Sequence, residues 1–329
     1  MIRRKTVMTG LALALIASPG LRAQPSTAMS RIGLLRPVDT LTPQEAQRQA
    51  ALRAGLRELG WIEGKNLVID IRYAGVNPQR QRELAAELKA LPVALILASG
   101  TITIRAARDG APGVPGVPIV MINAGDPVGA GLVASLARPG GLLTGTSAAG
   151  DETLPKQLEL LAAAVPQLKR VSVLMNSANP ANKLFFDALA ARASTLGVAL
   201  ERVTVSSVAE LDGAIARAKG GALLVLGDPM FGQNLLRVVE LTQGHKVRTM
   251  FGGRAYVAAG GLMSYLSAEA WHYRSAAGYV DKLLKGAKPA DLPVMQPTEF
   301  ELVINLKTAR MLGLTLPPSL LLRADEVIQ

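Results

Sequence analysis

Cysteine is absent from the 329-residue sequence, and histidine occurs only twice. The absence of cysteine excludes disulfide scaffolds, thiolate zinc sites, iron–sulfur clusters, cysteine nucleophiles and the lipidated cysteine of a bacterial lipoprotein. His245 and His272 are too few for a histidine-rich metal centre, and they are the only candidates for the base of a Ser-His-Asp triad. We therefore expect no metal site and no bound cofactor.

Aromatic residues make up 4% of the chain and charged residues 19%, whereas 49% of the residues are hydrophobic. This apolar content excludes an intrinsically disordered protein, because a disordered chain lacks the apolar surface that offsets its ordering entropy. The formal net charge of +11 is of the sign that nucleic acids attract. The basic residues are scattered, however, and are not interleaved with aromatic rings, so we expect no nucleic-acid partner.

The N-terminal segment has the three-part pattern of an export signal. Arg3, Arg4 and Lys5 form a positive region, residues 7–17 form an apolar run, and Ala23 is the expected last residue before cleavage. The apolar run is shorter than the roughly 20 helical residues that cross a bilayer. We expect a cleaved signal peptide, with general secretion ahead of twin-arginine export, and a soluble mature chain in the periplasm. A disordered tail is the alternative interpretation.

The rest of the sequence alternates apolar runs with amphipathic segments. Leu67, Ile69 and Ile71 alternate with Val68, Asp70 and Arg72, which predicts a strand with one wetter face near a sheet edge. The expected strands are residues 31–36, 67–72, 94–98, 117–122, 170–175, 199–205, 222–226, 248–251, 262–265 and 300–304. The expected helices are residues 43–59, 79–91, a short segment after 101, 128–137, 154–165, 181–196, 208–218, 234–243 and 268–285.

Continuous apolar strands separated by amphipathic helices predict parallel sheets that are covered on both faces. The expected fold is α/β, with two doubly wound parallel-sheet lobes joined by hinge crossovers. Hinges are expected near residues 145–147 and 252–254. The expected division is a first lobe of residues 30–145 joined by 257–290, a second lobe of 146–256, and a C-terminal segment of 291–329 that crosses back between the lobes.

Ligands of open parallel sheets bind beyond the carboxyl ends of the strands. Ser99, Gly100 and Thr101 follow an expected strand there, and they offer hydroxyl and N–H groups to a carboxylate at a helix start. Asn123 and Asp126 follow the next strand, where the Asp126 carboxylate can receive an ammonium group. Ordinary helix N-caps explain both groups of residues equally well.

The second half of the chain has matching polar loops. Asn176 and Asp228 follow expected strands, and Ser147, Arg254 and Tyr265 lie at the expected crossovers. A structural arginine and a core tyrosine are the alternatives for the last two. Two lobes with such loops can clamp a small solute between them. The candidate ligand-binding residues are Ser99, Gly100, Thr101, Asn123, Asp126, Ser147, Asn176, Asp228, Arg254 and Tyr265.

Catalytic motifs are incomplete. The segment GTSAAG from Gly145 lacks the second glycine of GxSxG, and GWIEGK from Gly60 is one residue too short for a phosphate-binding loop. The segment GAPGVPG from Gly110 lacks the GxGxxG spacing. Surface or capping positions are expected for His245 and His272, since neither has an acid and a nucleophile at a recognisable spacing. The sequence therefore predicts no catalytic residues and no enzyme activity.

Four long segments carry a family resemblance: RIGLLRP from Arg31, LRELGWIEGKNLVIDIRYA from Leu56, INAGDPVGAGLVASLARPGG from Ile122, and LPVMQPTEFELVINLKTARMLGLTLPPSLLLRADEVI from Leu292. The sequence resembles the bacterial ABC transporter substrate-binding proteins of the tryptophan/tyrosine-binding type, which have the type I periplasmic-binding-protein fold. The resemblance spans nearly the whole expected mature chain. The final Ala-Asp-Glu-Val-Ile and the Asp-Pro-Val after the fourth strand are typical of that family.

The resemblance implies a monomeric periplasmic receptor that captures a small solute and docks its closed form on an inner-membrane permease and ATPase. Members bind hydrophobic or aromatic amino acids and related carboxylates, although Tyr265 and Phe231 are the only evident stacking rings in these loops. By position, the family's cleft residues correspond to the loop after Arg36, residues 99–101, Asn123, Asp126, Ser147, Asn176 and Asp228.

Two alternatives belong to other classes of protein. A LacI-like effector-binding regulator has the same two-lobe fold, but it begins with a helix-turn-helix domain where this chain has the export pattern. An exported α/β enzyme needs a catalytic group that the motifs do not supply.

Overall fold

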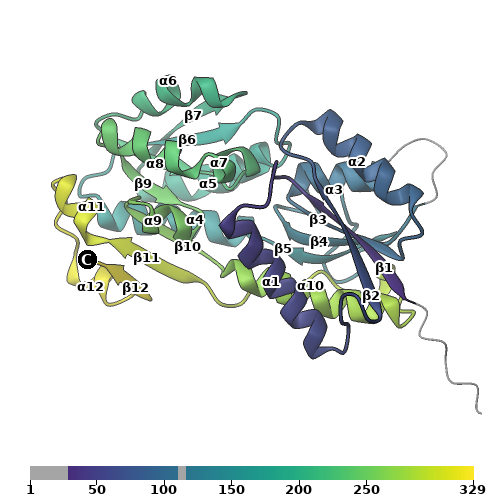
Figure 1. Cartoon of the computed structure of the whole chain (residues 1–329). Helices are drawn as coiled ribbons and strands as arrows, with labels where there is room; N and C mark the ends of the chain where they lie inside the picture. The colour runs from purple at the N-terminus through teal and green to yellow at the C-terminus, as the bar shows by residue number, and fades with distance from the viewer. Residues whose placement is uncertain (1–28, 110–115) are drawn as a thin grey trace, which may run out of the picture.

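The structure is a computed structural model that describes residues 29–109 and 116–329. The predicted export signal lies outside the described residues. Two α/β lobes stand side by side, each with a central sheet and flanking helices (Figure 1). This arrangement confirms the predicted fold class. Within the described ranges, no helix combines the length and the apolar character needed to cross a membrane.

The first lobe contains a five-stranded parallel sheet in the order β2-β1-β3-β4-β5, as far as the described residues go. β2 lies at the edge, as predicted. The predicted helix start is also correct, because the Thr42 hydroxyl accepts the Glu45 N–H at 3.2 Å and Pro43 opens the helix. The elements are β1 (Ser30–Arg36), α1 (Pro43–Glu58), β2 (Leu67–Tyr73), α2 (Pro78–Ala90), β3 (Leu95–Ser99), α3 (Thr101–Asp109), β4 (Ile119–Ala124) and β5 (Leu143–Ser147).

The predicted helix over residues 128–137 is wrong. This segment is a series of turns, in which the N–H groups of Leu132 and Val133 both bond to the Pro127 carbonyl. Gly131 then adopts a left-handed φ of 65°, which ends any helical continuation. Apolar residues at helical spacing were the basis of the prediction, and local turn chemistry overrides that pattern.

The second lobe contains seven strands in the order β12-β11-β10-β9-β8-β6-β7 within the described chain. Among these strands, only β10 and β11 pair antiparallel. The elements that follow β5 are α4 (Gly150–Ala164), β6 (Arg170–Asn176), α5 (Asn182–Leu196), β7 (Ala199–Val205), α6 (Leu211–Ala216), β8 (Ala222–Val225), α7 (Pro229–Gln233), α8 (Leu235–Gly244), β9 (Arg248–Phe251), α9 (Arg254–Ala258), β10 (Met263–Leu266), α10 (Glu269–Leu284), β11 (Glu301–Asn305), α11 (Leu306–Met311), α12 (Pro318–Leu321) and β12 (Glu326–Ile328). Of these, α10 packs on the first lobe and the others belong to the second. Two short 3₁₀ helices cover Val208–Glu210 and Pro289–Asp291.

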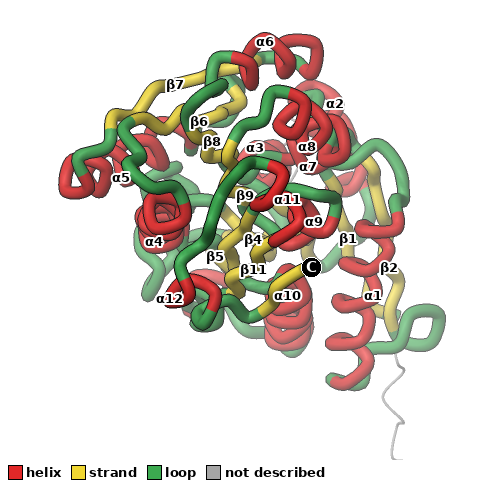
Figure 2. The backbone as a smooth tube through the Cα atoms, turned by 90° about the vertical axis from the view of Figure 1, so that its left-hand side faces the viewer, coloured by secondary structure: helices red, strands yellow, loops and turns green. Residues whose placement is uncertain are grey.

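Each sheet separates two apolar clusters, so the second lobe repeats the layered plan of the first. Helices lie outside the strands when the molecule is viewed from the side (Figure 2). In the first lobe, α1 and α10 pack together over one face of the sheet (Figures 1 and 2). Gly55 permits this close packing, because a Cβ there would lie 2.9 Å from the Cβ of Ala277.

The described chain passes between the lobes three times: between β5 and α4, between β10 and α10, and along residues 291–300. Residues 257–290 were expected in the first lobe, and α10 packs there. β10 instead extends the second sheet, where Met263 pairs with Met250 and is fully buried. β10 joins the second lobe because its apolar side chains are buried in the core of that lobe.

Neither of the two expected hinges is a free linker. Residues 145–147 belong to β5, whose Gly145 packs so closely on the Met121 backbone that a side chain cannot be placed there. Residues 252–254 join β9 to α9 within the second lobe. The crossover between β5 and α4 begins one step later, at residues 148–149, where Ala149 adopts a left-handed φ of 49°.

Candidate functional site

The carboxyl ends of the two sheets face one another across a region that we call the interlobe seam. Gln233 donates its side-chain amide to the Pro37 carbonyl at 2.7 Å, which ties the second lobe to the first. A Cβ atom at Gly100 would lie 3.6 Å from Pro229 Cγ. The lobes are therefore in contact. The seam consists of residues 37–42, 99–101, 123–129, 176–185 and 226–234.

Ser99, Gly100 and Thr101 lie together at the start of α3, as predicted. Ser99 and Thr101 are buried, and Gly100 needs its left-handed φ of 78° to turn the chain from strand to helix. The first N–H groups of an α-helix have no partners inside the helix. The N-terminus of α3 therefore presents donors and a partial positive charge to the seam.

Arg36 supports this turn from behind, and the sequence analysis did not single it out. Its guanidinium binds Glu45 through two bonds of 2.7 and 2.8 Å and donates to the Ser99 hydroxyl at 2.6 Å. Burial lowers the pKa of Arg36, but Tyr273 and Glu45 outweigh that effect and the pKa is raised. The guanidinium occupies one of the two lone pairs of the Ser99 oxygen, so the hydroxyl keeps its own proton to donate.

Asn123 and Asp126 lie on the loop after β4. The Asn123 N–H donates to the Thr146 hydroxyl at 3.0 Å, and the Asn123 Oδ1 atom is buried without a hydrogen-bond partner among the described residues. Asp126 accepts the Gly129 N–H at 2.8 Å. Turns and no helix follow Asp126, so this bond closes a turn and is not the helix N-cap that the sequence analysis kept as an alternative. Between them, Gly125 lies beside the Thr101 hydroxyl.

Asn176 and Asp228 meet in the second lobe at 3.0 Å, so two predicted residues from different strands form one cluster. Asp228 also accepts the amide of Asn179 at 2.9 Å and the N–H of Met230 at 2.9 Å. The carboxylate is 8% exposed and makes no salt bridge within the described parts of the chain. Burial raises its pKa despite these three bonds. Asp228 is thus a buried negative charge held by neutral donors alone.

Asn182 joins the same cluster and was missed by the sequence analysis. It begins α5, is 7% exposed, and donates its amide to the Asn176 carbonyl. That bond fixes the orientation of the amide, and Asn182 Oδ1 then has no partner among the described residues. The sequence feature that could have identified Asn182 is the segment Asn179-Pro180-Ala181-Asn182, in which a second asparagine follows Asn179 three residues later. The cluster therefore presents an excess of acceptors.

The three predicted crossover residues make structural contacts. Ser147 is 2% exposed and accepts the Ala149 N–H at 3.2 Å. Arg254 binds Glu326 through two bonds of 2.7 Å each, and the Tyr265 ring stacks on Phe300 with centroids 5.6 Å apart. These contacts agree with the alternative interpretations for Arg254 and Tyr265.

His272 connects two crossovers, so the expected surface or capping position is wrong for it. Its Nδ1 lies 3.1 Å from the Thr146 hydroxyl and its Nε2 lies 2.9 Å from the Ser267 hydroxyl. Thr146 already accepts the Asn123 N–H, so it can donate its proton to Nδ1 while Nε2–H donates to Ser267. Burial lowers the pKa of His272 to about 4, which keeps the ring neutral. His245 caps α8 near Asp212, as expected.

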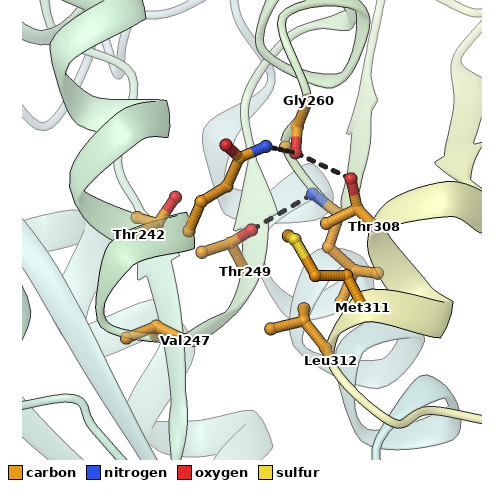
Figure 3. Close-up of a pocket in the computed structure, with 10 residues that line it drawn as sticks. Thr242, Val247, Thr249, Gly260, Thr308, Met311 and Leu312 are labelled. Carbon is orange, nitrogen blue, oxygen red and sulfur yellow. Dashed lines mark hydrogen bonds between the residues drawn. The ribbon is translucent and has the colours of Figure 1, made fainter.

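A small pocket lies away from the seam, between α8, β9 and α11 of the second lobe (Figure 3). The Gly260 carbonyl accepts both the Gln243 amide at 2.9 Å and the Thr308 hydroxyl at 2.8 Å, and Thr249 accepts the Leu262 N–H. These bonds satisfy the polar groups and leave no room for a water molecule. This region fastens the C-terminal segment to the lobe and is not a ligand site.

The family model described as ABC transporter substrate binding protein matches residues 39–328. The chain belongs to this family. Its members are solute-binding proteins rather than enzymes, and the match confirms the predicted resemblance. The family match covers both lobes and all parts of the seam except residues 37–38.

Individual relatives agree with this ABC substrate-binding family. The "Tyrosine-binding protein" of Clostridioides difficile (strain R20291) is 27% identical over 262 residues, which are 79% of this chain and 74% of that protein. A solved structure of the ABC domain from Streptococcus pneumonia in complex with L-Trp is 27% identical, with a TM-score of 0.82 over 92% of this chain and 100% of that one. A conserved domain protein from Vibrio cholerae is 25% identical, with a TM-score of 0.83 over 91% and 99%.

Proposed function

We propose that this ABC substrate-binding protein is a periplasmic receptor that captures an amino acid with a hydrophobic or aromatic side chain. The observation that carries the proposal is the pairing of opposite electrostatic surfaces at the seam. The buried Asp228 carboxylate lies next to Pro229, and Pro229 lies against Gly100 at the start of α3. A zwitterion fits between a negative site and a positive one, because each end supplies the charge that its site lacks.

The ammonium end of the solute binds in the second lobe. An ammonium group has three donors and one positive charge. Asp228 supplies the charge, and the unpartnered Oδ1 of Asn182 accepts a further hydrogen bond. In the closed state the ammonium group pairs a buried charge and a buried acceptor that otherwise have no partner. This pairing is the source of the affinity and of the selectivity for amines.

The carboxylate end binds in the first lobe. The N-terminus of α3 offers backbone N–H groups, and the hydroxyl groups of Ser99 and Thr101 border the same turn. Glu45 neutralises Arg36, so this end attracts an anion through hydrogen bonds and the helix dipole rather than through a full positive charge. A solute with both end groups touches both lobes.

Contact with both lobes explains how binding drives closure. Contacts to the second lobe exist only when the lobes have approached, so the solute stabilises the closed state of an existing equilibrium. The closed form then docks on an inner-membrane permease with its ATPase, and the solute is delivered unchanged. The tyrosine-binding relative and the L-Trp complex support an amino acid as the solute class.

A thermal-shift and calorimetry screen over amino acids, small carboxylates and amines tests the proposal. A solute at about 100 times its dissociation constant adds roughly 2.7 kcal/mol to the free energy of unfolding. We expect stabilisation by one or more hydrophobic or aromatic amino acids, and none by their deaminated or decarboxylated analogues. Equal stabilisation by the carboxylate analogues contradicts the assignment of an ammonium site.

The Asp228→Asn variant tests the residue that carries the proposal. Loss of the carboxylate should weaken amino-acid binding at least tenfold, or about 1.4 kcal/mol. The free energy of unfolding of the solute-free variant should change by less than about 1.5 kcal/mol, because loss of the hydrogen bond from Asn179 opposes relief of the burial of a charge. The same measurement on Asp126→Asn compares the two predicted carboxylates. A larger loss for Asp126→Asn places the ammonium partner in the first lobe instead.

A further inference from the structure

Phe185 is the aromatic side chain that reaches from the second lobe to the polar loop of the first. It lies one turn after Asn182 on α5 and is 8% exposed. Part of the residue belongs to the core of its own lobe. The end of the ring leaves that core, and it lies close to Gly125 on the loop after β4 and to Gly150 at the start of α4.

The Phe185 ring leaves no space for a side chain at Gly125 or Gly150. A Cβ atom at Gly125 would lie 2.7 Å from Phe185 Cζ, and one at Gly150 would lie 2.6 Å from Phe185 Cε1. Cβ atoms do not approach other atoms this closely. Neither glycine has a left-handed φ, so backbone conformation does not require glycine at either position. Close approach of a buried aromatic ring is the physical reason for both.

The ring ends beside the site proposed for the solute. The Thr101 hydroxyl lies 3.2 Å from the same Cβ position of Gly125 that Phe185 Cζ approaches, so ring and hydroxyl converge on one point. Asn182, with its unpartnered acceptor, precedes the ring by three residues on the same helix. Residues three apart on a helix share a face. Phe185 thus adds an apolar surface between the two polar ends.

We infer that Phe185 is a specificity-determining residue: its ring is the wall against which the solute side chain packs, and it limits the size of that side chain. This inference rests on the proposed function, since it assigns the side-chain subsite of the same solute. A wall of this kind contributes dispersion and hydrophobic contact, and its removal creates space for a larger group.

The test compares large and small solutes in matched pairs by calorimetry on the purified protein. The amino acid pair is L-tryptophan and L-valine. The carboxylate pair is indole-3-propionate and isovalerate, and the amine pair is tryptamine and isobutylamine. In each pair the measured quantity is the dissociation constant of the large solute divided by that of the small one. Phe185→Ala should lower this ratio at least tenfold relative to the unmodified protein, because the large solute gains space. Phe185→Leu should give an intermediate ratio and serves as the better-packed variant if Phe185→Ala fails to fold.

The neighbouring Phe186→Ala variant is the matched control. Phe186 packs partly buried against the same core, and Arg202 Cζ lies 4.1 Å from its ring centroid. Phe186 does not approach Gly125 or Gly150, so its loss should leave the ratio within twofold. A merely structural Phe185 would lower the free energy of unfolding without changing the ratio, and a ratio within twofold for Phe185→Ala and Phe185→Leu overturns the inference.

The matched pairs also separate this inference from the proposed function. Binding of the carboxylate or amine pair alone overturns the amino-acid proposal, while the size ratio within that pair still tests Phe185. Absence of binding by all six compounds overturns both, because both require a solute with an apolar side chain at the seam.

Discussion

At the residue scale, burial decides what the polar side chains near the seam can do. Asp228 and His272 are both ionisable, and both are held by neutral partners. Burial raises the pKa of Asp228 and lowers that of His272, because in each case the charged form loses its hydration. Asp228 lies at the seam, where we propose that the solute ammonium group binds. His272 instead links Thr146 and Ser267, and it controls how the lobes are joined.

The pH dependence of stability follows from His272. Its pKa falls from 6.5 to about 4 on folding, so the unfolded chain binds more protons between these values. The contribution is fully present above pH 6.5 and is lost as the pH falls through about 4, a change of about 3 kcal/mol. We expect His272→Gln to flatten the free energy of unfolding in that range, measured by urea denaturation.

The other histidine supplies the control for this measurement. His245 is partly exposed and contacts Asp212 on the surface, so His245→Gln removes a histidine while it leaves the buried ring of His272 in place. Identical pH slopes for His272→Gln and the unmodified protein would show that the ring does not titrate as a buried group.

At the element scale, β5 shows how one residue determines a strand pairing. The strand is short, and Gly145 has a φ of 132° that favours glycine. A Cβ there would overlap the backbone of Met121 on β4. The same strand carries Thr146, whose hydroxyl receives the Asn123 N–H and contacts His272. Pairing of β5 with β4 therefore positions both the candidate binding loop and the first crossover.

Gly145→Ala should destabilise the protein by more than 2 kcal/mol, because the backbone must shift and the left-handed region is strained for alanine. Gly141→Ala is the comparison, since Gly141 has a φ of 66° but no atom of the described residues lies within 4 Å of its Cβ position. Gly141→Ala should lower the free energy of unfolding by about 1 kcal/mol. Equal losses in chemical denaturation would mean that the close approach of β5 to β4 is unimportant.

At the scale of the whole molecule, side chains of the second lobe contact loops of the first lobe across the seam. Gln233 donates a direct hydrogen bond to the Pro37 carbonyl, and Leu184 and Phe185 pack against the loop of residues 125–129. The proposed receptor function requires this arrangement to be one state of an equilibrium that a solute can shift.

Removal of the Gln233 amide should shift that equilibrium toward the open state. We expect Gln233→Ala to increase the radius of gyration of the solute-free protein in X-ray scattering. It should also raise the dissociation constant of the solute severalfold, because binding must then supply more of the free energy of closure. The solute-saturated variant should have the same radius as the saturated unmodified protein. An unchanged solute-free radius contradicts a role of this bond in closure.

The sequence by itself determined the layered α/β architecture, most strand positions and the polar groups at strand ends, because apolar periodicity and the carboxyl-end rule are local properties of the chain. It placed Ser99 and Asn176 at the ends of buried strands and Thr101 and Asp228 shortly after buried strands, and the role of these residues in binding stays a prediction. It could not find Arg36, Asn182 or Phe185, and it misplaced His272 and β10. The tertiary structure decided these, because burial, ring packing against glycine and hydrogen bonds between crossovers join residues that are far apart in the sequence.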